Sequence, residues 1–116
     1  RKNAKLYQNI FKSSKFILQK EIGNSSSFWL TFIIKKKYKI KRNNLIKKLK
    51  KIGVECRPIV SGNFIKNEVC KYLNLKVHGK LKNADYISEN GFAIGNNHHN
   101  LTHNLKKLKI FLDKVK

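Results

Sequence analysis

Residues 54–64 have the sequence Val-Glu-Cys-Arg-Pro-Ile-Val-Ser-Gly-Asn-Phe, which holds the only Pro and one of only three Arg in a Lys-rich chain. The β-prone run from Val54 to Val60 follows a helical pattern that stops at Gly53, and it predicts a short strand. Ser61-Gly62-Asn63 then predicts a turn. A strand end that leads into such a turn presents backbone N–H groups and the Arg57 side chain at one place. This arrangement can hold an anionic or polyhydroxylated ligand, although an ordinary turn has the same sequence.

Helical and strand patterns continue on both sides of this stretch. Upstream, the apolar spacing predicts a helix over 2–12, a strand over 16–18, a buried strand over 28–34 and a helix over 44–52 with Asn43 as its cap. Downstream, it predicts helices over 65–73 and 83–90, the second with Asn83 as its cap, a strand over 91–95 and a last helix that starts at a Thr102 cap. The order of elements predicts an α+β fold, a small sheet with packed helices, in a single domain over 1–116.

The net charge of +21 has two interpretations. A strongly basic chain is typical of nucleic-acid binding, here through the Lys faces of 35–51 and 106–116. However, 24 of the 27 basic residues are Lys, Lys and Asn have A/T-rich codons, and readers of nucleic acid favour Arg. Phe28, Trp29 and Phe32 could stack on bases, but their strand is so apolar that a core position is favoured. A basic nucleic-acid-binding module therefore stays the alternative, and a non-catalytic protein-interaction domain is a third possibility.

The sequence offers no self-sufficient catalytic or metal site. Cys56 and Cys70 lack metal-ligand spacing and indicate reduced thiols in a cytoplasmic protein. His99 and His103 are four residues apart, but His99 precedes the expected helix, so no metal is expected. With six acidic residues and no nucleophile-elbow pattern, no residue is assigned as catalytic. No apolar run approaches the length of a membrane span, so no membrane partner is expected.

Four short motifs, taken in order, resemble the C-terminal part of the DegT/StrS-type sugar aminotransferases. They are Arg57–Phe64, Val69–Leu73, Asn83–Asp85 and Gly91–His98. Members of this family are pyridoxal 5'-phosphate (PLP) enzymes of the aspartate-aminotransferase fold that act on nucleotide-linked 4-keto sugars. The Arg-Pro-x-x-x-Gly-Asn-Phe and Gly-Asn-x-His-His patterns are more similar to the branch with keto-deoxysugar 3-dehydratases and lipopolysaccharide-sugar enzymes.

This resemblance implies that the chain is the small C-terminal domain of a longer cytoplasmic enzyme, with 1–13 as a linking helix. The start without Met, within a helical pattern, also suggests a fragment. The family resemblance further implies that a large domain outside this chain binds PLP and that the full-length protein is a homodimer. It also implies that the substrate is a nucleotide sugar used for cell-surface polysaccharide. Four residues are then expected to bind substrate: Arg57, Asn63, His98 and His99. The His98-His99-Asn100 ending departs from the family's His-Pro-Gly-like loop. Amination or dehydration depends on a Lys or His of the large domain.

Overall fold

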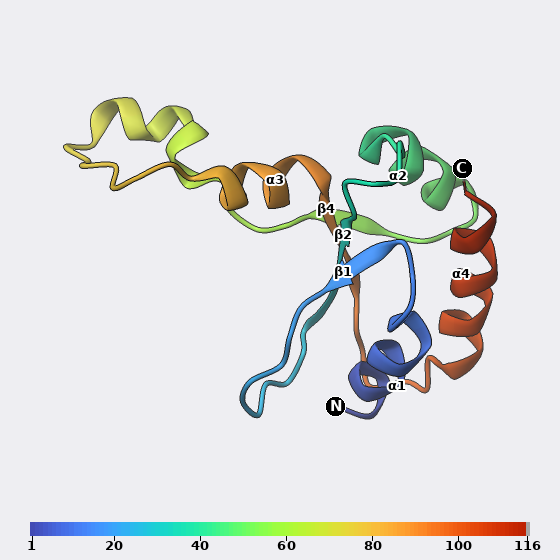
Figure 1. The fold of residues 1–116 in the computed structure, drawn as a ribbon. Coiled ribbons are helices and arrows are strands. Elements are labelled where there is room, and N and C mark those ends of the chain that lie inside the picture. Colours follow the sequence, from blue (N-terminus) through green and yellow to red (C-terminus); the bar gives the residue numbers. More distant parts are fainter. Residues whose placement is uncertain (116) are drawn as a thin grey trace.

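The computed structural model describes residues 1–115, which form a four-stranded sheet with helices packed against it (Figure 1). The strands are β1 (Phe16–Leu18), β2 (Trp29–Ile34), β3 (Cys56–Pro58) and β4 (Gly91–Gly95). The α-helices are α1 (Lys2–Phe11), α2 (Arg42–Lys51), α3 (Lys82–Asn90) and α4 (Thr102–Lys114). All neighbouring strands are antiparallel, in the order β1-β2-β4-β3. The predicted α+β fold is confirmed.

Helices α1, α2 and α4 lie on one face of the sheet, and the core lies between them and the strands (Figure 1). Every second residue of β2 is buried there, namely Leu30, Phe32 and Ile34. The Phe32 ring stacks on the ring of Phe92, with 5.2 Å between centroids, and meets Phe11 edge-on at 5.0 Å. Aromatic pairs of this kind add about 0.5–1.5 kcal/mol to the stabilisation from burial. This aromatic cluster fixes the sheet against α1.

The opposite face of β2 is only partly covered, because no helix of the three-helix layer reaches it. Trp29, Thr31 and Ile33 point to this outer face and are partly exposed. The prediction of a buried strand over 28–34 is therefore right for one face and wrong for the other. Phe28, just before β2, is 71% exposed. The interpretation of the aromatic residues as core is confirmed for Phe32 and wrong for Phe28.

The helix starts correct three predictions. The structure places Asn43, Asn83 and Thr102, the predicted caps, inside α2, α3 and α4. The residues at the N-cap positions are Lys41, Leu81 and Leu101, and their side chains make no capping hydrogen bond. Arg42, in the first turn of α2, instead binds the end of α3: its guanidinium donates to the backbone oxygens of Ser88 and Gly91 at 2.6 and 3.3 Å. These partners are 46 and 49 residues away, so local cap rules cannot identify them.

Two predicted chain reversals are confirmed. Gly53 ends α2 with φ +80, and its N–H donates to the Lys50 backbone oxygen at 3.0 Å, as in left-handed helix ends. Ser61 and Gly62 both have positive φ, +66 and +50, in the turn after β3. The chain thus leaves the sheet abruptly at residue 61.

Two segments extend beyond the strands of the sheet (Figure 1). The hairpin loop, residues 19–28, joins β1 to β2. The arm, residues 60–81, holds two short 3₁₀-helices, η1 (Phe64–Lys66) and η2 (Glu68–Tyr72), where one helix over 65–73 was predicted. The predicted inner stripe is exposed, with Tyr72 at 86%, because the arm extends beyond the core. Within residues 1–115 no helix is long and apolar enough to cross a membrane.

Candidate functional site

On the outer face of the sheet, the central strand β4 carries small residues, with a charged residue on the neighbouring strand β3 and an aromatic residue on the neighbouring strand β2. Arg57 of β3 pairs with Ala93 of β4, which pairs with Thr31 of β2, so the three side chains share one face. Trp29 lies opposite Gly95 on the same face. A Cβ at Gly95 would meet no atom within 4 Å. Gly95 therefore leaves open space beside Trp29, whereas Ala93, at 3% exposed, is covered.

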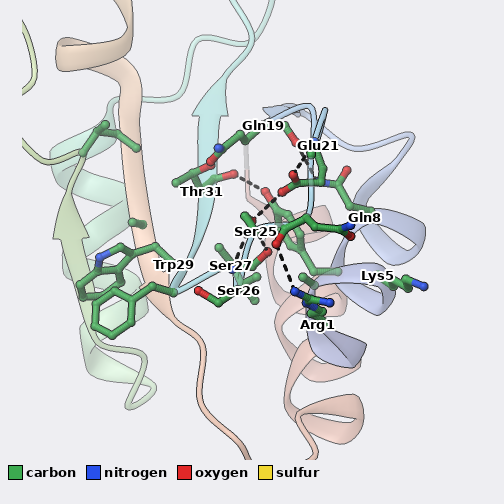
Figure 2. A pocket seen from close by; sticks show the side chains of 18 of the residues that line it. Arg1, Lys5, Gln8, Gln19, Glu21, Ser25, Ser26, Ser27, Trp29 and Thr31 are labelled. Atoms are coloured by element: carbon green, nitrogen blue, oxygen red, sulfur yellow. Dashed lines mark hydrogen bonds between the residues drawn. The ribbon is translucent and has the colours of Figure 1, made fainter.

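A cavity of about 490 Å³ adjoins this face (Figure 2). Its walls come from the outer face, including Trp29, Thr31 and Ala93, from the hairpin loop, and from the first turns of α1. The loop is held by its own polar contacts: the Glu21 carboxylate accepts from Ser25 Oγ at 2.6 Å and from the Gly23 N–H at 2.9 Å. These hydrogen bonds lower the pKa of Glu21 below its ordinary value. The hairpin loop thus forms a polar wall of the cavity, in which these hydrogen bonds favour the ionised form of Glu21.

Arg57 is paired with a residue that the sequence reasoning did not assign, Glu55. One carboxylate oxygen of Glu55, Oε1, accepts from Arg57 Nε at 2.9 Å and lies 2.7 Å from Arg57 Nη2. The Arg57 and Glu55 side chains are 60% and 73% exposed. An exposed pair contributes little to stability, typically about 0–1 kcal/mol. Its geometry matters more for what Arg57 can bind.

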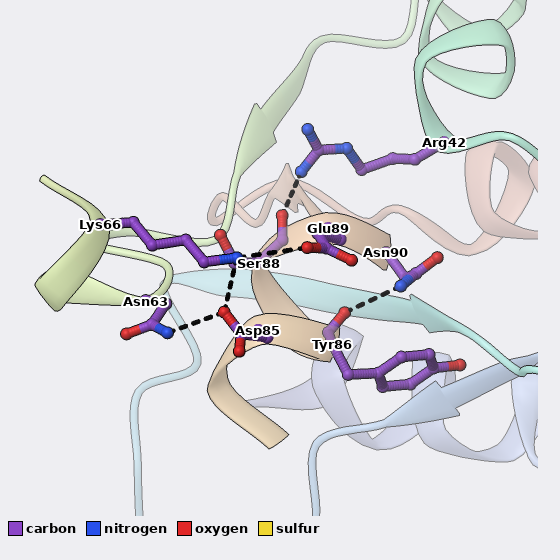
Figure 3. A network of polar contacts seen from close by, with 8 residues as sticks. All are labelled: Arg42, Asn63, Lys66, Asp85, Tyr86, Ser88, Glu89 and Asn90. Carbon is purple, nitrogen blue, oxygen red and sulfur yellow. Dashed lines mark hydrogen bonds and ion pairs between the residues drawn. The ribbon is translucent and has the colours of Figure 1, made fainter. Parts of the chain in front are cut away.

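Asn63 is the second predicted site residue, and it makes a contact inside the molecule (Figure 3). It is 5% exposed, and its Nδ2 donates to Asp85 Oδ1 of α3 at 2.8 Å. Lys66 Nζ lies 2.6 Å from the same oxygen and 3.3 Å from Glu89 Oε1. Lys66 and Asn63 lower the pKa of Asp85, while hydrogen bonds from Lys66 to Asp85 and Glu89 raise the pKa of Lys66. This network attaches the base of the arm to α3.

His98 and His99, the other two predicted site residues, lie in the exposed loop after β4. Their rings are 4.0 Å apart between centroids. Asn3 of α1 fixes this loop from below: its Nδ2 donates to the backbone oxygens of Asn97 and His99 at 3.1 and 2.7 Å. Asn3 also accepts from the Leu101 N–H at 3.2 Å. The His pair is therefore carried on a loop whose backbone is anchored.

The structure does not gather the four predicted site residues into one cluster. Asn63 follows β3 near the start of β4, and His98 follows the end of β4, so they lie at opposite ends of the sheet. Arg57 lies between these ends, on the outer face. Among the described residues, no group of three or more His, Cys, Asp or Glu side chains could hold a metal ion. Burial raises the pKa of the Cys56 thiol to about 11, which keeps it protonated and unreactive at neutral pH.

Sequence reasoning missed Glu55 and Asn3. Glu55 is two residues before Arg57, a spacing that places both side chains on one face of a strand, so the alternation of strands could have identified it. Asn3 is four residues before Tyr7 and lies on the buried face of α1. A polar residue at an apolar position of a helix is a signal for a buried hydrogen-bond network.

Comparison with known proteins defines the class. Residues 1–108 match the DegT/DnrJ/EryC1/StrS aminotransferase family, and the chain belongs to this family. It is 41% identical, over 98% of its length, to the GDP-4-keto-6-deoxy-D-mannose 3-dehydratase of Yersinia pseudotuberculosis. It is 45% identical, over 83% of its length, to the enzyme of the same name from Escherichia coli. The chain spans 30% and 25% of these two relatives.

Solved structures agree with this assignment. The Escherichia coli GDP-4-keto-6-deoxy-D-mannose-3-dehydratase with bound hydrated PLP superposes with a TM-score of 0.92 at 41% identity, over 97% of this chain and 29% of the other. A variant of the dehydratase with bound GDP-perosamine gives the same TM-score and identity, over 97% of this chain and 30% of the other. A putative sugar aminotransferase from Streptococcus pneumoniae, 15% identical with a TM-score of 0.67, shares the fold. The family resemblance predicted from the sequence is confirmed.

Proposed function

We propose that this chain is the small C-terminal domain of a PLP-dependent 3-dehydratase that acts on a GDP-linked 4-keto-6-deoxy sugar. The observation that carries the proposal is 41% identity over nearly the whole chain to proteins of that name, with the same domain structure. The sequence alone left amination and dehydration open. We favour dehydration because the relatives that align over most of this chain at 41–45% identity are named 3-dehydratases.

PLP, when bound, supplies an electron sink for chemistry next to the keto group. The described residues do not form a holder for it. A Lys that bonds to PLP is typically desolvated, whereas every described Lys here is partly or fully exposed. We therefore assign PLP binding and the residue that moves protons at the cofactor to the part of the enzyme outside this chain. Residues 1–13 would connect the two parts.

The role of this chain is then to help bind the sugar nucleotide from the outer face of the sheet. Arg57 is on that face and is proposed as a substrate ligand. Asn63 would act indirectly, by holding the turn after β3 against α3, as its buried bond to Asp85 suggests. His98 and His99 are proposed to reach substrate hydroxyls from the loop that Asn3 anchors.

Three further statements stay proposals on the basis of family membership. The full-length protein is expected to be a homodimer. It is expected to work in the cytoplasm, in the synthesis of sugars for cell-surface polysaccharide or lipopolysaccharide. The substrate is expected to be a GDP-linked sugar, in keeping with the names of the relatives.

The test is an assay of the full-length enzyme, loaded with PLP, on GDP-4-keto-6-deoxymannose with glutamate as amino donor. We expect a keto sugar that has lost its 3-hydroxyl group, identified by mass spectrometry and NMR. A product with a new amino group at C4 would instead identify an aminotransferase. No conversion of this or any related nucleotide sugar would contradict the proposal.

A further inference from the structure

The Glu55–Arg57 pair on the outer face combines a hydrogen-bond acceptor and a donor at one place. Glu55 Oε1 occupies the Nε and Nη2 side of the guanidinium, at 2.9 and 2.7 Å. Within residues 1–115, no hydrogen bond involves Glu55 Oε2 or Arg57 Nη1. The pair therefore presents a free carboxylate oxygen beside free guanidinium N–H groups, and both side chains are mostly exposed.

This arrangement is poorly suited to a phosphate group. An anion that approaches Arg57 also approaches the Glu55 carboxylate, which lies within hydrogen-bond distance of the guanidinium. Because Coulomb energies fall only as the inverse of distance, repulsion by the carboxylate offsets much of the attraction by the guanidinium. The net charge of the pair is zero, so it contributes little to the capture of a diphosphate.

A hydroxyl group fits the same pair well. A hydroxyl is both a donor and an acceptor, so neighbouring hydroxyls can donate to Glu55 Oε2 and accept from Arg57 Nη1. Hydrogen bonds to charged groups are stronger than those between neutral groups, which favours this geometry over a hydroxyl in water. Sugar rings carry such neighbouring hydroxyls, and phosphates at neutral pH lack the donors.

The surroundings of the pair also suit a ring. Ala93 lies directly beside Arg57 in the sheet, and the space above Gly95 is empty. Trp29 stands on the other side of β4 and lines the adjoining cavity. Ala93 itself is covered, at 3% exposed, so the open space is at Gly95. This space, with the Trp29 ring at one edge, can accept the apolar face of a pyranose. The charged pair would then hold its hydroxyl edge.

We propose that Glu55 and Arg57 together bind hydroxyl groups of the sugar, beside the open space at Gly95, and that the diphosphate is bound elsewhere. Glu55 becomes a specificity-determining residue, because it turns an Arg that would attract any anion into a site for a neutral polyhydroxylated ring. This inference rests on the proposed function, since it assumes a nucleotide-sugar substrate.

The test compares two ligands on the full-length enzyme, GDP and GDP-perosamine, by calorimetry on wild type, Glu55→Gln and Arg57→Ala. We expect GDP to bind all three proteins equally, and both substitutions to weaken GDP-perosamine by about tenfold, the scale of one charged hydrogen bond. Steady-state kinetics should show a raised KM for the nucleotide sugar. Glu68→Gln is the matched control, because Glu68 forms a similarly exposed ion pair with Lys71 on the arm.

Two outcomes would overturn the inference while the proposed function stands. Weaker GDP binding by Arg57→Ala, or tighter GDP binding by Glu55→Gln, would show that Arg57 binds phosphate. Unchanged affinities for both ligands would show that the pair is only a surface ion pair. If wild-type protein bound no nucleotide sugar at all, the proposed function would fail instead. Equal thermal melting of all variants confirms that the comparison reports binding.

Discussion

At the scale of single residues, buried polar side chains do more to place the loops than the local sequence suggests. Asn3 is 9% exposed and uses both ends of its amide, with three acceptors around Nδ2 and one donor at Oδ1. Removing such a group leaves several part-buried partners without hydrogen bonds, and this costs more than the bond itself contributes. The anchored loop carries His98 and His99.

Asn3→Ala is therefore expected to destabilise the protein by about 2 kcal/mol, since more than one part-buried partner loses its hydrogen bond. Urea unfolding followed by circular dichroism measures the change. Asn9→Ala is the control: Asn9 is on the same helix but exposed, and Ala is a better helix former. If both variants lose the same stability, Asn3 has no anchoring role.

Gly62 shows how tightly the turn after β3 meets α3. It has φ +50, and a Cβ there would come within 2.6 Å of Ser88 Oγ and 3.2 Å of Ser88 Cβ. We expect Gly62→Ala to cost about 1–2 kcal/mol for the left-handed backbone plus a further penalty for the contact. Calorimetric melting measures the loss.

Gly79→Ala separates the two costs, because Gly79 has φ +73 but nothing within 4 Å of its Cβ position. It should lose only the backbone part. Adding Ser88→Gly to Gly62→Ala should recover the extra stability that Gly62→Ala loses relative to Gly79→Ala, because the contact with the Ser88 side chain is then absent. If Gly62→Ala and Gly79→Ala are equally destabilised, the close approach to Ser88 has no energetic consequence.

At the scale of elements, the arm is joined to α3 by polar contacts that titrate. The folded-state pKa of Asp85 is lowered, so its contribution to stability is present above the ordinary Asp pKa and is lost as pH falls through the folded value. The pKa of Lys66 is raised, so its contribution is present below the ordinary Lys pKa and is lost as pH rises above it. The attachment is thus strongest at intermediate pH.

Hydrogen exchange tests this expectation. Amides of residues 64–73 should exchange faster relative to the core once the pH falls through the lowered pKa of Asp85 than at pH 6, after correction for intrinsic rates, because Asp85 becomes protonated. In Asp85→Asn the fast exchange should already be present at pH 6. Glu68→Gln, which changes an ion pair within the arm, should keep the wild-type profile. A wild-type arm whose relative exchange does not depend on pH would contradict the role of the network.

The sequence predicts most elements because their apolar spacing is local. The stripe of Leu105, Leu108 and Leu112 identified α4, and the β-branched and aromatic run identified β2. Residues 65–73 of the arm were predicted as a single helix because the spacing of Ile65, Val69 and Tyr72 is the same whether the stripe is buried or not. Burial depends on what packs against the stripe, and that information is not local.

The candidate site was predictable only in part, for the same reason. Arg57 and the turn were conspicuous as rare residue types, and their place at the end of β3 was foreseen. Their relation to Ala93 and Trp29 depends on β4 lying between β2 and β3, which no local pattern specifies. The buried use of Asn63 depends likewise on Asp85, 22 residues further on.

At the scale of the whole molecule, apolar surface and positive charge coexist on the projecting arm. The exposed apolar residues of the arm include Phe64, Val69, Leu73 and Val77. A group of exposed apolar side chains normally lies in an interface. The chain also carries a net charge of +21, which keeps copies apart at low salt. This apolar surface is therefore expected to be covered by another part of the protein or by another chain.

The isolated chain should therefore associate more strongly as salt rises, because the screening length falls from about 30 Å at 0.01 M to about 3 Å at 1 M. Analytical ultracentrifugation over this range measures the effect. The double variant Val69→Ser/Leu73→Ser should stay monomeric at every salt concentration. Ile110→Ser, at an exposed site on α4, is the control and should behave as wild type. Association that weakens with salt would point to charge-driven contacts.

The place of β4 in the sheet also has a consequence for synthesis on the ribosome. β2 and β3 are made early, but the sheet joins them only through β4, which is completed at residue 95. Until then the emerging chain holds strand edges without partners, and such edges are prone to aggregate. Pairings between residues so distant in sequence also form slowly. The sheet can therefore close only after β4 has emerged, and ribosome-associated chaperones would find unpaired strand edges in that interval.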